Sequence, residues 1–217
     1  MAAQTPKGTL PVVVLKDDAN QVKGREAQKN NIAAAKIIAD IVHTSLGPKG
    51  MDKMLVDSLG DVTITNDGAT ILKEIDVQHP AAKMLVEISK TTDNEVGDGT
   101  TSAVVLAGAL LEHAETLVLQ DVHPTIIVDG YRKAGKKARE FLDQIADKVS
   151  PTDNTVLLKI AKTSMQTKLV RKDSEQLADM IVKAVKAVAE KNGDKFTVDI
   201  DDIKAVSYTH LTLPTKA

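Results

Sequence analysis

The sequence contains no cysteine and no tryptophan, and aromatic residues make up only 2% of its 217 positions. The lack of cysteine excludes disulfides and any Cys-His catalytic pair. A core with so few aromatic side chains has to be built from Ala, Val, Ile and Leu. These absences favour a helical protein whose elements pack through small residues.

The chain also lacks an excess of charge of either sign. Lysine and arginine total 28 against 30 acidic residues, so no net field favours nucleic acid or an anionic membrane as the main partner. We find no apolar run that is expected to cross a bilayer, and no signal-peptide pattern at the N-terminus. We therefore expect a cytoplasmic protein that binds neither nucleic acid nor membrane.

Hydrophobic residues make up 42% of the chain, which is enough to bury a core in one or two domains. Their spacing predicts a mainly helical α+β fold with a few short strands. The apolar run 10–15 is expected to form a terminal strand or arm that pairs with a neighbouring subunit. The other expected elements of the first part are helices over 27–45, 80–90, 100–120 and 124–145, and strands over 54–56 and 62–65.

A polar, proline-containing stretch at 148–154 is the best candidate for a domain boundary. It divides the chain into residues 1–150 and residues 151–205. Within the second part, the run Phe196–Ile200 alternates like a strand, and the sequence shows no partner for it. Two shorter helices are expected before it, around 156–162 and 174–191.

The last residues differ from everything before them. Residues 206–215 have neither charge nor helical period, and they resemble the translated read-through of a sequencing-library adapter. Residues 206–217 are therefore expected to be a non-native tail, and the chain a fragment whose native sequence continued beyond Ala205.

The stretch Gly97–Ser102 contains two glycines, one carboxylate and three hydroxyl groups in consecutive positions. The glycines allow a tight turn and a close approach of the backbone to a ligand. Asp98 offers the hard oxygen that Mg²⁺ prefers. The hydroxyl residues open an apolar helix, whose unpaired N–H groups and dipole favour phosphate. The pattern predicts a phosphate site with a metal ligand; the alternative is a helix cap with flexible glycines before a core helix.

Two other loops have related chemistry. Residues 46–50, Leu-Gly-Pro-Lys-Gly, form either a tight, backbone-exposed loop at a helix end or simply a Gly-Pro helix stop. Asn66-Asp67-Gly68 is a strong turn signal in its own right. It also puts a second acidic residue, Asp67, at a strand-to-helix corner, the same kind of place as Asp98.

Other motifs are interpreted as chemically silent. Residues 130–137 fit the pattern G-x-x-x-x-G-K, but Lys137 stands where a P-loop needs Ser or Thr for Mg²⁺, so the match is a coincidence. The five histidines are scattered singly, with no pair at metal spacing. No Ser-His-Asp set can be assembled either.

Three motifs in order, 44–54, 66–72 and 97–101, resemble the nucleotide site of group II chaperonins, most closely the archaeal thermosome subunits. The likeness covers roughly residues 9–205. It implies that residues up to about 150 form the N-terminal part of an equatorial ATP-binding domain. Residues from about 151 would form the first segment of an intermediate domain. The implied activity is ATP hydrolysis that drives lid closure over unfolded client proteins, inside a double ring built with other chaperonin subunits.

The resemblance also assigns roles toward ATP and Mg²⁺. Asp98 would coordinate Mg²⁺, and Asp67 would orient the attacking water. Gly68 would lie close to the phosphates, and Lys168, at the end of the loop 163–168, would reach the γ-phosphate. The other implied contacts to the nucleotide come from the glycine loop and from the loop after the first helix: Gly97, Gly99, Thr100, Thr101, Ser102, Leu46, Gly47 and Pro48.

The chain departs from the family's pattern at Thr167, where the family commonly has glycine. A residue less able to adopt a positive φ is expected to change the path of that loop. The likeness does not extend to the client-binding apical domain, the returning intermediate segment with a second catalytic aspartate, or the second equatorial half. These residues alone are therefore expected to hydrolyse ATP slowly or not at all.

Two other function classes fit the same motifs. A small-molecule kinase or NTPase could use the same phosphate loop, although the four arginines lie outside the three motifs. A non-enzymatic helical interaction module could keep a vestigial phosphate site.

Overall fold

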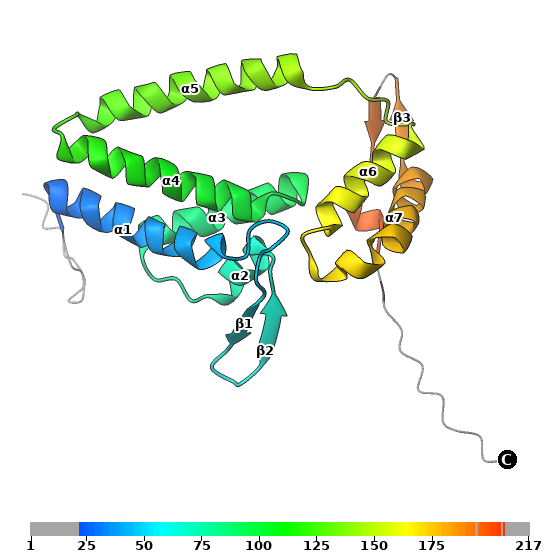
Figure 1. Cartoon of the computed structure of the whole chain (residues 1–217), viewed down its shortest axis with the longest axis horizontal. Coiled ribbons are helices and arrows are strands. Elements are labelled where there is room, and N and C mark those ends of the chain that lie inside the picture. The colour runs from blue at the N-terminus through cyan, green and yellow to red at the C-terminus, as the bar shows by residue number, and fades with distance from the viewer. Residues whose placement is uncertain (1–21, 194, 205, 207–217) are drawn as a thin grey trace, which may run out of the picture.

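The computed structural model describes residues 22–193, 195–204 and 206. The expected arm 10–15 lies outside the described residues, as does the expected tail 206–217 apart from Val206. Within the described part the chain forms seven α-helices, two 3-10 helices and two separate two-stranded sheets (Figure 1). The expected mainly helical α+β class is confirmed.

The first part of the chain is built around three long helices that pack side by side (Figure 1). These are α1 (Gly24–His43), α3 (Pro80–Val96) and α4 (Thr100–Leu119), and the short α2 (Gly68–Glu74) packs against all three. The expected helix starts at Pro80 and Thr100 are confirmed. The hydrophobic core cluster is entirely aliphatic, as the composition predicts: Ala35, Ile38, Ala39, Val42, Ile71, Leu72, Ala82, Leu85 and Val104.

Helices α1 and α4 run antiparallel and approach each other closely. Lys36 Nζ, in the middle of α1, lies 2.9 Å from Glu112 Oε1 of α4. Further along α1, Ala39 packs so tightly on Gly108 that a Cβ built on this glycine would lie 2.3 Å from the Ala39 Cβ. Because the two helices run in opposite directions, the loop that follows α1 comes level with the first turn of α4.

Helix α4 corrects one expectation from the sequence. It is the one helix in the described part of the chain that is long and apolar enough to cross a membrane, with a mean hydropathy of 1.5. The linear sequence hides this because Glu112 and Glu115 interrupt the apolar residues. Both glutamates face Lys36, whose Nζ lies 3.9 Å from Glu115 Oε2, so in this fold α4 packs against α1 as a bundle helix.

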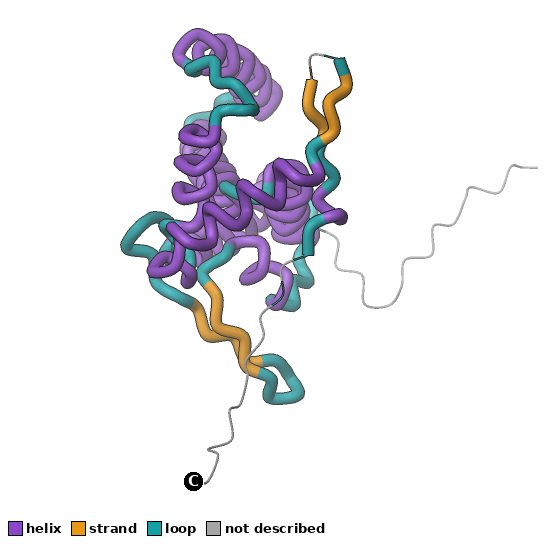
Figure 2. The backbone as a smooth tube through the Cα atoms, turned by 90° about the vertical axis from the view of Figure 1, so that its right-hand side faces the viewer, coloured by secondary structure: helices purple, strands orange, loops and turns teal. Residues whose placement is uncertain are grey.

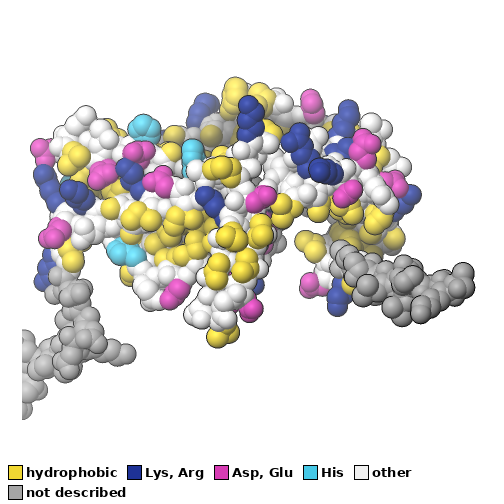
Figure 3. Space-filling model, turned by 60° about the horizontal axis from the view of Figure 1, so that its bottom comes forward, with side chains coloured by type: hydrophobic (Ala, Val, Ile, Leu, Met, Phe, Trp, Pro, Cys, Tyr) yellow, Lys and Arg dark blue, Asp and Glu magenta, His cyan; other side chains and the backbone are white. Residues whose placement is uncertain are grey.

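A hairpin projects from the helices between α1 and α2 (Figure 1). It consists of β1 (Lys53–Val56) and β2 (Val62–Thr65), paired antiparallel, and it confirms the two expected strands. Pairing places Met54 opposite Ile64 and Val56 opposite Val62. These four side chains are 56–68% exposed, so one face of the hairpin is apolar and uncovered. Figure 3 shows such hydrophobic side chains, in yellow, gathered on this side of the molecule.

Helix α5 (Pro124–Ile145) begins at the expected His-Pro pair, with the His123 Nδ1 accepting a hydrogen bond from the Thr125 N–H. It turns back over α4, and Tyr131 ties the two together by donating its hydroxyl to the Leu110 carbonyl at 2.7 Å. Its second half carries large apolar side chains that remain more than half exposed: Phe141, Leu142 and Ile145.

The remaining residues form a separate group of elements (Figure 1). Helix α6 (Asn154–Met165) packs on α7 (Ser174–Val188), with the 3-10 helix η1 (Leu169–Asp173) between them. Asp153 caps α6 by accepting from the Thr155 N–H at 2.8 Å, as expected of the capping stretch.

The end of this group differs from the sequence prediction. The helix expected to reach 191 ends at Val188, and the expected strand 196–200 is β4 (Lys195–Thr197), followed by the 3-10 helix η2 (Ile200–Asp202). The partner that the sequence did not reveal is β3 (Glu190–Asn192), paired antiparallel with β4. Figure 2 shows this second hairpin projecting from the helices. All three β3 residues are exposed, so no buried face produces the alternation that predicts a strand.

The contact between α1 and α4 predicts opposite effects for the same substitution at two helical glycines. Replacing Gly108 by alanine adds a Cβ against Ala39, so we expect a loss of about 1–3 kcal/mol in the free energy of unfolding. Gly135→Ala on α5 meets nothing within 4 Å, so we expect a gain of about 0.5–1 kcal/mol from helix propensity. Urea unfolding followed by circular dichroism measures both, and equal effects would contradict the packing argument.

Candidate functional site

The glycine loop between α3 and α4 has the backbone that its sequence predicts. Gly97 ends α3 with φ 71° and donates its N–H to the Asp93 carbonyl at 2.8 Å. Gly99 has φ 77° and forms the N-cap of α4. Both values lie in the left-handed region, where a side chain would be strained. Asp98, between them, is exposed, and its Oδ1 accepts the Gly99 N–H at 2.8 Å.

The first turn of α4 has the properties of an anion site. Because Gly99 has no side chain, no side chain at the N-cap satisfies the N–H groups of this turn. The positive end of the helix dipole points the same way. Thr100 and Thr101 are buried, at 2% and 8% exposure, whereas Ser102 is exposed. Backbone N–H groups and the Ser102 hydroxyl are therefore the groups available to a ligand here.

Gly68 places the strand-to-helix corner that holds Asp67 against the first turn of α4. A Cβ built on Gly68 would lie 2.5 Å from Thr101 Oγ1 and 2.9 Å from the Thr101 Cα. The start of α2 thus lies directly on the start of α4, and only glycine leaves room for it. This contact joins two motifs that are far apart in the sequence.

Asp67 is the N-cap of α2 and uses both carboxylate oxygens. Its Oδ2 accepts from the Thr70 N–H and from the Thr70 hydroxyl, each at 3.0 Å. Its Oδ1 lies 2.5 Å from Lys168 Nζ. Partial burial acts to raise the pKa of Asp67, but the hydrogen bonds from Lys168 and Thr70 outweigh it and hold the pKa below its usual value. Asp67 is therefore an ionised, oriented carboxylate at neutral pH.

Lys168 comes from the other group of elements. Helix α6 ends at Met165, and the Lys168 N–H donates to the Met165 carbonyl at 3.0 Å before η1 begins. Thr167 keeps a negative φ, since Asp121 is the one non-glycine residue with positive φ in the described part of the chain. With threonine in place of the family's glycine, the loop still delivers the Lys168 ammonium to Asp67.

The loop after α1 lies at the same end of the bundle. Leu46 donates its N–H to the His43 carbonyl at 3.1 Å, and Gly50 to the Gly47 carbonyl at 2.9 Å. Gly47 has φ 84°, a conformation that favours glycine. Leu46 and Pro48 are exposed. The antiparallel packing of α1 and α4 brings this loop level with Thr100.

The predicted site residues thus fall into two sets. Direct contacts join Asp67 with Lys168, and Gly68 with Thr101. The glycine loop with Asp98, and the loop 46–48, lie at the same end of the bundle, but among the described residues no hydrogen bond or ion pair ties either of them to Asp67.

Two residues with structural roles at the site were missed by the sequence reading. Thr70 supplies two of the three hydrogen bonds to Asp67, and the Asp-x-x-Thr spacing of a capped helix start could have revealed it. Asn66, only 9% exposed, donates its Nδ2 to the Thr167 carbonyl at 2.7 Å. A contact between residues 101 positions apart cannot be predicted from a local sequence pattern.

A magnesium ion fits the single carboxylate that the site offers. No three His, Asp or Glu side chains converge within the described residues, so a cage made of protein ligands alone is not present there. Mg²⁺ is commonly held by one or two carboxylates together with substrate phosphates and water. Asp98, exposed beside a helix start that favours phosphate, matches that arrangement.

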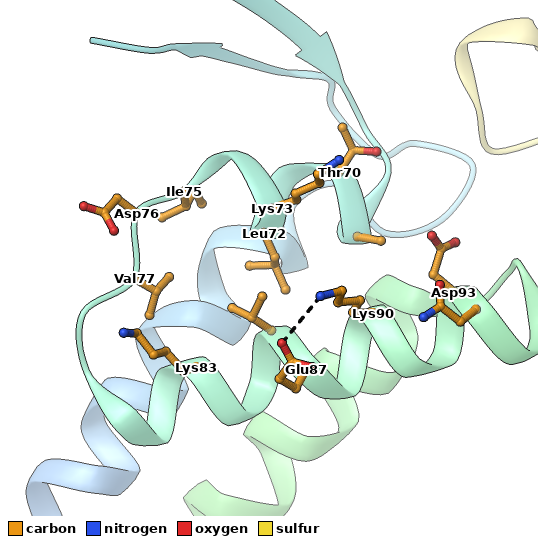
Figure 4. Close-up of a pocket in the computed structure, with 13 residues that line it drawn as sticks. Thr70, Leu72, Lys73, Ile75, Asp76, Val77, Lys83, Glu87, Lys90 and Asp93 are labelled. Atoms are coloured by element: carbon orange, nitrogen blue, oxygen red, sulfur yellow. Dashed lines mark ion pairs between the residues drawn. The ribbon is translucent and has the colours of Figure 1, made fainter.

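A cavity of about 630 Å³ lies between α2 and α3, next to this site but not in it. Figure 4 shows Lys73 of α2 beside it, with the ion pair of Glu87 and Lys90 of α3 across it. None of the predicted site residues lines this cavity, and its floor is apolar, formed by Leu72, Ile75, Val77 and Val86.

Several known proteins are similar in sequence to this chain. The chain is 58% identical over 194 residues to a thermosome subunit of Pyrococcus abyssi, covering 89% of this chain and 35% of that protein. It is 57% identical over 200 residues to the thermosome subunit alpha of Archaeoglobus fulgidus, covering 92% of this chain and 36% of that protein. For the thermosome subunit alpha of Thermoplasma acidophilum the identity is 57% over 197 residues. The chain thus spans about a third of the length of these relatives.

The resemblance inferred from the three motifs is therefore confirmed. The family model described as TCP-1/cpn60 chaperonin matches residues 38–215, most of the chain. The chain belongs to the TCP-1/cpn60 chaperonin family.

Proposed function

We propose that the glycine loop and the two neighbouring corners bind Mg-ATP, as the nucleotide site of a chaperonin subunit that hydrolyses ATP to drive protein folding. One observation carries the proposal: the uncapped start of α4, with Asp98 beside it, lies against the corner that holds Asp67 and Lys168. A phosphate site, a metal ligand, a carboxylate and an ammonium group are the parts that phosphoryl transfer needs.

The roles follow from the exposure and direction of each group. Backbone N–H groups of Thr100 and Thr101 and the Ser102 hydroxyl would hold phosphate oxygens, while Gly97 and Gly99, whose N–H donates to Asp98, keep the turn open. Asp98 would hold Mg²⁺, which when bound supplies positive charge to the phosphates. Leu46, Gly47 and Pro48 would line the other side of the nucleotide, since their loop comes level with Thr100, and Gly68 would lie close to the phosphates.

Asp67 and Lys168 would act on the terminal phosphate. An ionised Asp67, held in place by Thr70, is suited to orient a water molecule by accepting its hydrogen bond. The Lys168 ammonium pairs with Asp67. Because it is positively charged, it would move to bind the negatively charged γ-phosphate. The site would thus sense whether the third phosphate is present.

The division of the chain and its assembly are part of the same proposal. We assign residues 1–150 to the equatorial ATP-binding domain, residues 151–205 to the intermediate domain and residues 206–217 to a non-native tail. The relatives are named as thermosome subunits, and we propose that this chain also assembles with other subunits in a ring, in the cytoplasm. Unfolded clients would bind a domain outside this chain. The uncovered apolar face of the β1–β2 hairpin is a suitable subunit contact.

Asp98→Ala tests the metal ligand. We expect it to weaken binding of ATP in the presence of Mg²⁺ by at least about tenfold, because a carboxylate ligand is lost. Binding of ATP in EDTA should stay the same. Isothermal titration calorimetry measures both, and Asp143→Ala, an exposed aspartate of α5, is the matched control. Unchanged Mg-ATP affinity in Asp98→Ala would refute the metal assignment.

Lys168→Met tests recognition of the third phosphate. Removing a charge-assisted hydrogen bond should weaken ATP binding by about tenfold and leave ADP binding unchanged. Competition against a fluorescent nucleotide gives both affinities. Lys172→Met, an exposed lysine of η1, serves as the control. Equal losses for ATP and ADP would mean that Lys168 supports the fold of the site and does not read the γ-phosphate.

The hairpin contact predicts the behaviour of charged variants. Sedimentation velocity of the unmodified chain should show self-association that depends on concentration. The double change Met54→Lys and Val62→Lys should weaken it by at least about tenfold, because two charges would be buried in the contact. Met84→Lys, at an equally exposed position of α3, should have no effect. The hairpin is not the contact if Met84→Lys weakens association as much.

A further inference from the structure

Two adjacent residues at the end of β2 hold two adjacent residues of the other group of elements. Asn66 Nδ2 donates to the Thr167 carbonyl at 2.7 Å, and Lys168 Nζ lies 2.5 Å from Asp67 Oδ1. Among the described residues, these are the two side-chain hydrogen bonds or ion pairs that join the two groups. Each spans 101 positions of sequence.

The two links differ in what they fix. The link from Asn66 ends on a backbone carbonyl, so it fixes the position of the chain itself. The amide is 9% exposed, and a buried amide that lost its partner would be left unsatisfied, which makes this contact costly to break. The link from Lys168 ends on a flexible side chain of four methylene groups and is more than a quarter exposed at both partners.

If its backbone were not held in place, a lysine side chain would rarely pair with one particular carboxylate. Partly exposed ion pairs gain little energy, and holding a long side chain in one geometry costs rotamer entropy. When the Thr167 carbonyl is fixed, the Lys168 Cα is held within reach of Asp67. This lowers the entropy cost of forming the ion pair. The hydrogen bond to Thr167 therefore raises the effective concentration of the ammonium group at Asp67.

We propose that Asn66 is a positioning residue: by holding the Thr167 carbonyl, it places the Lys168 ammonium on Asp67. We call the hydrogen bond from Asn66 to the Thr167 carbonyl the clamp, and it involves protein groups only. Only its consequence, that Asn66 would also keep Lys168 within reach of a γ-phosphate, rests on the proposed function. Thr167 suits the clamp, since it is partly buried and its φ is negative.

The test follows the carboxyl ¹³C signal of Asp67 during acid titration of the whole chain, without nucleotide. Aspartate is labelled selectively, and Asp67→Asn assigns the signal. Asn66→Ala should shift the titration midpoint of Asp67 upward, toward that of an unpaired aspartate, because Lys168 no longer holds the ionised form. Lys168→Met should shift it the same way. The control Asn30→Ala, an exposed asparagine of α1, should leave it unchanged.

The double variant separates positioning from a direct effect. If Asn66 acts through Lys168, adding Asn66→Ala to Lys168→Met produces no further shift of the Asp67 midpoint. A midpoint that does not move in Asn66→Ala overturns the proposal. So does a shift of the same size in the Lys168→Met background, since Asn66 would then act on Asp67 directly.

A measurement on the unmodified chain covers the case in which Asn66→Ala does not fold. One side-chain amide proton of Asn66 is held in the hydrogen bond to the Thr167 carbonyl. It should therefore exchange with solvent at least about tenfold more slowly than the side-chain amide protons of Asn30. Equal exchange overturns the clamp. Because no nucleotide is present, failure of Mg-ATP binding would refute the proposed function and leave these results standing.

Discussion

The close approach of α1 to α4 is the constraint on which the rest of the first part depends. It needs a residue without a side chain at Gly108, facing the single methyl group of Ala39. With so few aromatic side chains, the bundle gains its burial by bringing backbones near each other. Because α1 and α4 run antiparallel, the loop after α1 and the first turn of α4 lie at the same end of the bundle.

Several helix boundaries could be read from the sequence, because they have local chemistry, whereas the end of α7 at Val188 could not. His-Pro pairs open α3 and α5, glycines flank Asp98, and Asp153 caps α6. The strand β3 could not be read in this way, since all three of its residues, Glu190–Asn192, are polar and exposed and give no alternation of apolar and polar positions. The extent of α4 was predicted, but not that it is apolar enough to cross a membrane, because Glu112 and Glu115 interrupt its apolar residues; in the fold both glutamates lie near Lys36 of α1.

The candidate site shows the same limit. Asp67 and Asp98 stand out in the sequence because both follow a turn and precede a helix, and each does occupy such a corner. Their neighbours come from elsewhere in the chain. The packing of Gly68 on Thr101 and the bond from Asn66 to Thr167 are products of the tertiary fold, so no window of sequence contains both partners.

The contacts that join the two groups of elements differ in kind from the contacts inside each group. Each interior is mainly aliphatic, as Val104 in one and Val182 in the other illustrate, whereas among the described residues the two groups are joined by one side-chain hydrogen bond from an amide and one ion pair. Dissolved salt weakens attraction between charges that touch water and leaves apolar burial intact or strengthens it. Raising the ionic strength therefore weakens the ion pair between the two groups, and it leaves the neutral hydrogen bond and both interiors intact.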